Sequence, residues 1–534
     1  MILKKMENRQ NTYGQQQIPG LGIPPQGSMM LPPMQQQNSR RARWGKRLMS
    51  GDSLSLTSLP DWFATYAVGA YAIALLGVNM MFSNYAMEWY FWLFGIAWVA
   101  GFFYLSVKFS KEWSVKRIRH QKTFEKRLFQ VGISLRLLYA IFIYYFYIGM
   151  TGIPHEFATA DSTEYIVTAE WLARGLDGGY FWDVVSQLSS TSFSDMGFPL
   201  YILLPVRLFE GNTAVFFILI INAIFGAYTA VIIYRLASRK MSETTARMGA
   251  IFCTLHPVLI CYVGLTLKEV IMTWLLVLFV DLADRMLVGK TYTFATIAPL
   301  ALTGFALFMF RTVLGLVAIM AVFFALLMTD SKIVSWGKKV VLGIMLIGAV
   351  FLGASDRIMN EVNQIRNTDI RQEQETAMTM RYGSQKGGKD GGNKFADYAG
   401  AAVFAPMIFT IPFPTMVTTD GQEDMRLIHG GNWMRNVMSG FVIFALFMLL
   451  LTGDWRRYSL PLAIVLGYIV VLVFSSFAHS LRFHIPTMPF EMMFAAYAIA
   501  NMRKKHRNWY LYWCMFMVVA CFAWNWFKLK GRGL

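Results

Sequence analysis

Long uninterrupted apolar runs are the feature that most constrains this chain, because about 20 apolar residues are enough to cross a bilayer as a helix. Such runs recur along most of the 534 residues, of which 56% are hydrophobic and 15% are charged. A soluble domain has roughly 45–50% apolar and about 25% charged residues. We therefore predict an all-α polytopic membrane protein.

Short basic segments between the apolar runs indicate the orientation, because cytoplasmic loops carry an excess of Lys and Arg. The segment "KFSKEWSVKRIRHQKTFEKR" is expected inside, which places two large loops, 151–196 and 355–432, outside the cytoplasm. About thirteen transmembrane helices are expected, near residues 62–83, 88–108, 130–150, 213–235, 247–264, 269–287, 292–310, 313–329, 340–354, 434–452, 459–477, 485–501 and 509–527.

Five regions are expected along the chain. Residues 1–50 form a Gln- and Pro-rich cytoplasmic tail with a basic end, which is expected to be disordered. Residues 51–129 hold two N-terminal transmembrane helices and a basic loop, and residues 130–354 form the main membrane module with the loop 151–196. Residues 355–432 form the second loop, in which the prolines of "AAVFAPMIFTIPFPTMV" favour a membrane-dipping segment over a straight helix. Residues 433–534 hold the last transmembrane helices.

Charge and cysteine usage exclude several classes of function. The net charge of +18 comes from basic residues in short loops, which argues against a nucleic-acid partner. The four cysteines lie inside apolar runs and show no metal-type spacing. His479 and His484 have no third ligand nearby in the sequence, so no metal site is predicted from them. No cofactor is indicated, although Asp195 is open as a second acid or as a ligand of a divalent metal.

Two carboxylates stand beside a predicted membrane boundary. The segment "ATADSTEYIVTAEWLARG" (158–175) follows an apolar run and contains Asp161 and Glu164. If the segment is helical, Asp161 shares one face with Glu164 and Tyr165. Spacing alone leaves two interpretations open, since Asp161 can cap the helix or act as a catalytic carboxylate.

Four stretches, in this order, resemble the GT-C membrane glycosyltransferases. They are "DSTEYIVTAEWLARG", "GFPLYILLPVRLFEGN", "HPVLICYVGLTLKE" and "RFHIPTMPF". The chain is most similar to the branch containing protein O-mannosyltransferases and lipid A aminoarabinose transferases. The resemblance covers roughly residues 130–310 and 475–501, and it implies a GT-C-like bundle with 130–354 as its catalytic module.

The resemblance also implies a reaction. Such enzymes pass a sugar from a polyprenyl-phosphate carrier to a glycan, lipid or protein acceptor outside the cytoplasm. Asp161 would be the general base that takes the acceptor proton. The family's acidic doublet is replaced here by Asp161 and Ser162, which leaves Glu164 and Asp195 as candidates for a second acid. The leaving phosphate needs positive charge, for which the candidates are Lys268, Arg311 and Arg482.

Structural roles remain open for several of these residues. Lys268 is followed by Glu269 and is equally compatible with a local charge at a helix end, and Arg311 is compatible with snorkelling from an apolar span. Further candidates for the site are Tyr165, Glu269, His479 and His484.

Two other functions fit a polytopic chain of this kind. One is an O-antigen-type polysaccharide polymerase or ligase, and the other is a transporter of lipid-linked glycans. Transporters usually contain internal repeats, and none is visible here. The expected protein is a multi-pass glycosyltransferase of the bacterial inner (cytoplasmic) membrane, with its active site facing outside. Its expected partners are the lipid-linked donor, the acceptor and membrane lipids, with no nucleic acid.

Overall fold

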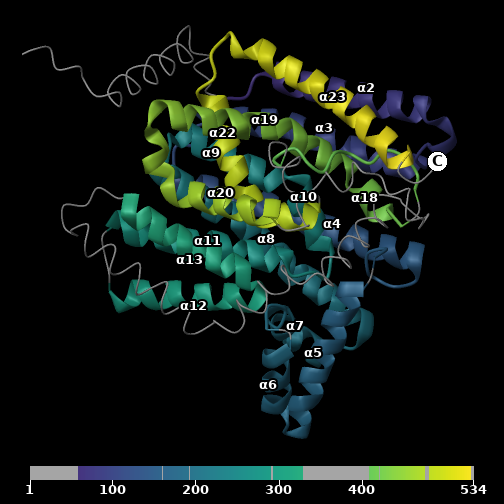
Figure 1. The fold of residues 1–534 in the computed structure, drawn as a ribbon, viewed down its shortest axis with the longest axis vertical. Helices are drawn as coiled ribbons and strands as arrows, with labels where there is room; N and C mark the ends of the chain where they lie inside the picture. The colour runs from purple at the N-terminus through teal and green to yellow at the C-terminus, as the bar shows by residue number, and fades with distance from the viewer. Residues whose placement is uncertain are drawn as a thin grey trace, which may run out of the picture.

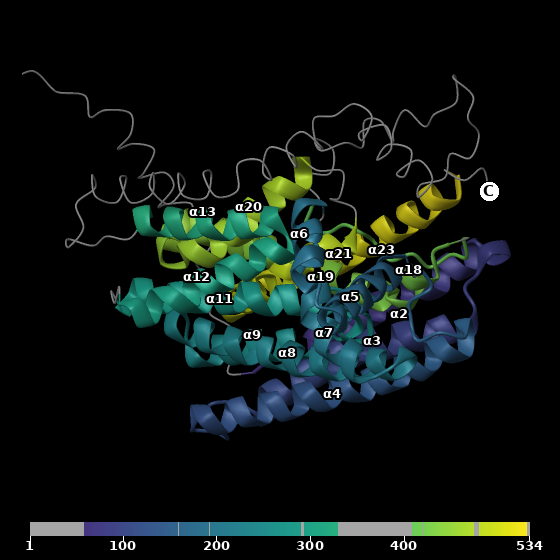
Figure 2. The ribbon, with the colours of Figure 1, turned by 90° about the horizontal axis from the view of Figure 1, so that it is seen from below.

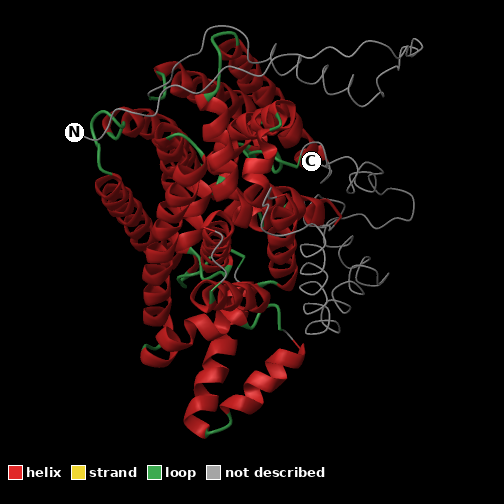
Figure 3. Ribbon diagram, turned by 90° about the vertical axis from the view of Figure 1, so that its left-hand side faces the viewer, coloured by secondary structure: helices red, strands yellow, loops and turns green. Residues whose placement is uncertain are grey.

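The computed structural model describes residues 58–158, 160–191, 193–289, 293–328, 408–419, 421–474 and 480–530. Within these residues every regular element is a helix (Figure 3), which confirms the all-α prediction. The predicted disordered tail 1–50, the predicted span 340–354 and most of the predicted second loop lie outside the described residues.

The described helices have the following bounds. The α-helices are α2 (Asp61–Met81), α3 (Trp89–Glu112), α4 (Gln121–Thr151), α5 (Ala160–Gly178), α6 (Phe181–Thr191), α7 (Gly197–Leu208), α8 (Gly211–Lys240), α9 (Glu243–Leu255), α10 (Pro257–Cys261), α11 (Glu269–Gly289), α12 (Phe294–Phe310), α13 (Thr312–Met328), α18 (Glu423–Leu427), α19 (His429–Thr452), α20 (Ser459–Phe474), α21 (Leu481–His484), α22 (Met488–Ala500) and α23 (His506–Lys530). The 3-10 helices are η1 (Ser83–Tyr85), η2 (Tyr262–Gly264), η4 (Asp454–Tyr458) and η5 (Ile485–Thr487).

Seven helical stretches among the described residues are long and apolar enough to cross a membrane. They are α2, α3, α4, α8, α19, the stretch Asp454–Val473 and α23. The bent pair Glu243–Leu255 and Pro257–Gly264 makes an eighth if it forms one span. Every predicted span outside 340–354 overlaps a helix, but α12 and α13 have 17 residues each and α22 has 13. The number of about thirteen crossings is therefore not confirmed and stays a prediction.

Helix α8 lies at the centre of the bundle and packs against α4, α7, α9, α11 and α22 (Figure 1). Small residues allow this close packing, as is usual between helices in a membrane: a Cβ on Gly132 of α4 would meet the Cβ of Ala227 of α8 at 3.5 Å. Figure 2 shows α4 along one edge of the bundle. Helices α5, α6 and α7 project from the bundle as a group (Figure 1), and α7 connects them to α8 and α12.

A proline breaks the helical stretch that runs from α9 into α10. Pro257 has no N–H for the carbonyl of Cys253, so α9 ends at Leu255 and α10 continues at an angle of 49°. The guanidinium of Arg136, fully buried in α4, donates to the carbonyls of Thr254 (3.1 Å) and Cys253 (3.5 Å). The break is thus satisfied internally, and the chain turns through η2 toward α11.

The described part of the proline-rich segment, 408–419, is a buried stretch without helix. Polar side chains of two neighbouring helices satisfy its backbone: Asn436 of α19 donates to the carbonyl of Pro412 (3.1 Å), and Asn525 of α23 accepts from the Met416 N–H (2.7 Å). Irregular backbone inside a membrane protein requires such partners. The segment leads into α18, which lies next to the projecting group.

Candidate active site

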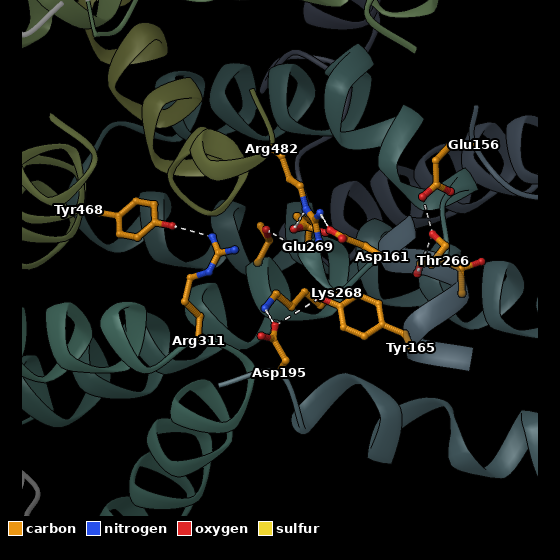
Figure 4. A network of polar contacts seen from close by, with 12 residues as sticks. Glu156, Asp161, Tyr165, Asp195, Thr266, Lys268, Glu269, Arg311, Tyr468 and Arg482 are labelled. Carbon is orange, nitrogen blue, oxygen red and sulfur yellow. Dashed lines mark hydrogen bonds and ion pairs between the residues drawn. The ribbon is translucent and has the colours of Figure 1, made fainter. Parts of the chain in front are cut away.

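An ion-pair chain joins the projecting group to the bundle (Figure 4). Arg482 of α21 donates through Nη1 to Asp161 of α5 and through Nε to Glu269 of α11. The Glu269 side chain is fully buried, whereas that of Asp161 is 48% exposed. Glu269 therefore fixes the inner side of the guanidinium, and Asp161 is the carboxylate of this pair that is accessible from the surface. The carboxylate of Asp161 is thus engaged in an ion pair with Arg482.

A second pair lies beside the first. The ammonium of Lys268, just before α11, contacts the carboxylate of Asp195, just before α7. Lys268 is buried, and burial lowers its pKa because the charged form loses hydration. Tyr165, one turn after Asp161 on α5, donates its hydroxyl to Asp195 at 3.3 Å. Asp195 is half exposed, so this pair also borders open space.

Arg311 brings a third cation to the same place (Figure 4). It lies between α12 and α13, donates through Nη1 to the hydroxyl of Tyr468 (3.2 Å), and stands 4.4 Å from the ring centroid of Phe483. Its charge is close enough to interact with those of Lys268 and Arg482. These contacts show that the Arg311 side chain is packed against Tyr468 and Phe483.

A glycine allows the elements that carry these cations to meet. A side chain on Gly197, the first residue of α7, would come within 2.9 Å of the Met309 backbone and 2.6 Å of the Phe310 ring. Because the position has no side chain, the turn bearing Asp195 can lie against the end of α12, next to Arg311.

Sequence reasoning missed Glu156, which lies in the loop before α5. The hydroxyl of Ser162 is 2.5 Å from the Glu156 carboxylate and 3.3 Å from the carbonyl of Thr266, the residue two before Lys268. Burial raises the pKa of Glu156 to about 7, since its charged form is poorly solvated. Ser162, the residue that replaces a second acid in the motif, thus links α5 to a buried carboxyl group.

Glu156→Gln is expected to flatten the pH dependence of stability. The folded protein retains the Glu156 proton between about pH 4.5 and 7, where the unfolded chain releases it. The free energy of unfolding of the native protein therefore falls by up to about 3 kcal/mol as the pH rises through this window. Melting temperatures of both proteins between pH 5 and 8 test this, with Glu170→Gln, a surface carboxylate on α5, as control. Parallel curves for all three would contradict it.

Asp424 of α18 was also missed, and it fastens the start of the projecting group. Its two carboxylate oxygens accept the backbone N–H groups of Phe157 (3.2 Å) and Ala158 (3.0 Å), directly before α5. Burial raises the pKa of Asp424, and these two hydrogen bonds oppose the shift. Asp424, in the region 355–432 that the sequence predicts as a second loop, therefore holds the start of the helix that carries Asp161.

Asp424→Ala is expected to lower the free energy of unfolding by roughly 1.5–3 kcal/mol, because two N–H groups lose a charged acceptor. The sugar transfer that the resemblance implies should fall by about 10-fold or more, since Asp161, its expected base, loses part of its support. Thermal unfolding in detergent and a transfer assay measure the two effects. Asp177→Ala is the matched control, because Asp177 is exposed and pairs with Arg207 at the surface. Equal behaviour of both variants would contradict the role of Asp424.

Two predicted candidates among the described residues are not part of this cluster, and a third cannot be placed. Glu164 is exposed on α5 and joins none of these contacts. His484 is buried and its Nδ1 lies 2.9 Å from Arg435 of α19, so it belongs to the interior of the bundle. His479 lies outside the described residues. Within the described residues, no three His, Cys, Asp or Glu side chains are grouped so that they could hold a metal ion.

A many-helix bundle with acids and cations gathered at one junction defines a polytopic membrane protein with a site suited to group transfer. Residues 425–531 match the model of the Alg9-like mannosyltransferase family, a family with the GT-C fold. The matched part runs from α18 into α23 and includes Arg482. This match confirms the resemblance at the level of the GT-C glycosyltransferases, and the chain is a membrane glycosyltransferase. No curated protein compared with the chain matches it.

Proposed function

We propose that this protein transfers a sugar from a polyprenyl-phosphate carrier to a hydroxyl group of an acceptor outside the cytoplasm. The observation that carries the proposal is the Asp161–Arg482–Glu269 chain: an accessible carboxylate is paired with a guanidinium whose other side is held by a buried acid. General-base catalysis and stabilisation of a leaving phosphate need these two groups side by side.

Asp161 supplies the base in this proposal. The acceptor oxygen attacks the anomeric carbon, its proton passes to the Asp161 carboxylate, and the bond between the anomeric carbon and the phosphate oxygen breaks. Asp161 lies in the first turn of α5, where Asp424 and the Ser162–Glu156 contact hold the helix. A hydroxyl is a weak nucleophile, so a positioned base contributes typically 10²–10⁴-fold to the rate.

The three cations would hold the donor phosphate. Lys268, Arg311 and Arg482 face three carboxylates at rest, so the cluster is close to neutral before substrate binds. An arriving phosphate can replace the half-exposed Asp161 and Asp195 as partner of Arg482 and Lys268. The same step releases Asp161 to act as base, because its pairing with Arg482 otherwise competes for the carboxylate.

The family match favours mannose as the first sugar to test. The experiment uses the purified full-length protein with labelled polyprenyl-phosphate mannose and a membrane-glycan fraction as acceptor. We expect label in the glycan and stoichiometric release of polyprenyl phosphate, and no transfer from a nucleotide-linked mannose. Transfer from the nucleotide sugar alone, or retention of intact label on the carrier with every acceptor fraction, would refute the proposal. The same assay separates a transferase from a transporter, which leaves the donor intact.

We further propose that the site faces outside the cytoplasm. The described cysteines are buried, so a cysteine placed at an exposed position can be labelled selectively. A membrane-impermeant maleimide applied to intact cells should label Glu164→Cys on α5 and leave Lys116→Cys, in the basic loop before α4, unmodified. The opposite pattern would reverse the orientation.

A further inference from the structure

A groove between α19 and α23 shares no residue with the candidate active site. It is open to the surface, encloses about 240 Å³, and is lined almost entirely by apolar and aromatic side chains. The two helices run antiparallel here, since His506 contacts Phe444 while Trp513 donates to the carbonyl of Asn436 (3.1 Å). Both helices are long and apolar enough to cross a membrane, so hydrocarbon chains are the natural neighbours of this surface.

One polar group points to a ligand in the groove. His506, the first residue of α23, is 1% exposed and lines the groove. Its Nδ1 accepts the backbone N–H of Arg503 at 3.2 Å, so in the neutral ring the proton sits on Nε2. Among the described residues, this Nε2 has no hydrogen-bond partner. A buried donor without an acceptor is costly, and a ligand oxygen at the mouth of the groove would satisfy it.

Positive charge surrounds the same end of the groove. Residues 503–507 read "RKKHR", and Lys504, Lys505 and Arg507 are exposed. Arg507 lies against the Tyr66 hydroxyl (2.7 Å) and 5.9 Å from the Trp62 ring centroid, which fixes its charge beside α23. The positive end of the α23 helix dipole adds to this field. An anion with an attached apolar chain matches both parts of the surface.

We propose that this groove binds an anionic phospholipid. One acyl chain lies between α19 and α23 against Phe444 and Trp513, and a phosphate oxygen accepts from His506 Nε2 near Lys504 and Lys505. Basic clusters directly next to a transmembrane helix attract anionic lipids electrostatically. The assignment is independent of the proposed transfer reaction, because binding is measured without any sugar donor.

Native mass spectrometry of the full-length protein in detergent tests the site. The probes are phosphatidylglycerol, phosphatidylcholine with the same acyl chains, and glycerol 3-phosphate as the head group alone. We expect phosphatidylglycerol to bind at least about 10-fold more tightly than phosphatidylcholine, and Lys504→Gln/Lys505→Gln to weaken it roughly 30-fold. His506→Phe keeps the ring and removes the donor, which should weaken binding about 10-fold. The control is Lys116→Gln/Arg117→Gln, an exposed basic pair in another loop, which should bind as the native protein does.

A second measurement needs no variant. Phosphatidylglycerol with a photoactivatable acyl chain should cross-link to peptides covering 437–447 and 502–513. Cross-links confined to other helices, or equal affinity for both phospholipids, would overturn the proposal. If glycerol 3-phosphate binds as tightly as phosphatidylglycerol, the site binds a free phosphate and not a lipid, and the proposal is wrong. Unchanged binding by His506→Phe would overturn the assignment of His506 Nε2 as the donor to the phosphate.

Discussion

Asp161→Asn is expected to lower the turnover number by about 10²–10⁴-fold, because the amide cannot accept the proton of the acceptor hydroxyl. Donor binding should change little, since Arg482, Lys268 and Arg311 all remain. The variant should also fold normally: the Asp161 side chain is 48% exposed, and pairs at such positions contribute at most about 1 kcal/mol. Transfer rate, donor affinity and melting temperature of the purified variant give the three readouts.

Glu170→Gln is the matched control for this variant. Glu170 lies on the same helix and pairs at the surface with Arg174, so removal of its charge tests the general effect of a neutral amide on α5. It should retain native turnover. If Asp161→Asn transfers sugar at the native rate, another group is the base and the proposed mechanism is wrong. If it loses donor binding as well, Asp161 serves to position Arg482 and takes no proton.

The sequence predicts much of this cluster because its motifs lie where apolar runs end. Asp161, Lys268 and Arg482 each stand at the edge of such a run, and the structure gathers them although up to 321 residues separate them. Helix positions follow from the same apolar runs. The number of membrane crossings does not, because apolar helices of 13 to 17 residues such as α22 and α12 satisfy the hydropathy pattern without being long enough to span by themselves.

Side-chain direction explains the candidates that do not join the cluster. His484 is two residues after Arg482, and residues two apart on a helical turn point in different directions. His484 therefore enters the bundle while Arg482 faces α5. On α5, Tyr165 is four residues after Asp161 and reaches Asp195, whereas Glu164, one residue earlier, is turned toward solvent.

Glu156 and Asp424 could not be found from spacing, because each acts through tertiary contacts. Asp424 accepts from N–H groups 266 and 267 residues away, and no periodic pattern in its short helix marks that role. Glu156 precedes the acidic motif and is distinguished only by burial against Ser162. Burial of a carboxyl group in a loop depends on tertiary contacts, and the spacing of residues in the loop does not reveal them.

The Arg482–Glu269 pair gives the second large expected effect. Arg482→Gln leaves the fully buried Glu269 carboxylate without its cation, and loss of one partner of a buried pair costs about 3–5 kcal/mol of stability. The same change removes a cation from the leaving phosphate, where one lost donor typically lowers the turnover number by about 10²–10³-fold. Unfolding in detergent and the transfer assay measure these effects separately.

The double variant Arg482→Gln/Glu269→Gln separates stability from catalysis. Two amides can hydrogen-bond to each other in place of the ion pair, so most of the lost stability should return. Transfer should remain low, because the positive charge for the phosphate is still missing.

Arg482→Lys is a useful comparison for both variants. Lysine keeps the positive charge but lacks the planar guanidinium that contacts Asp161 and Glu269 at once, so this variant should show intermediate activity. Native turnover in the double variant would exclude Arg482 from the leaving-group site, while native stability in Arg482→Gln would show that the pair does not stabilise the fold.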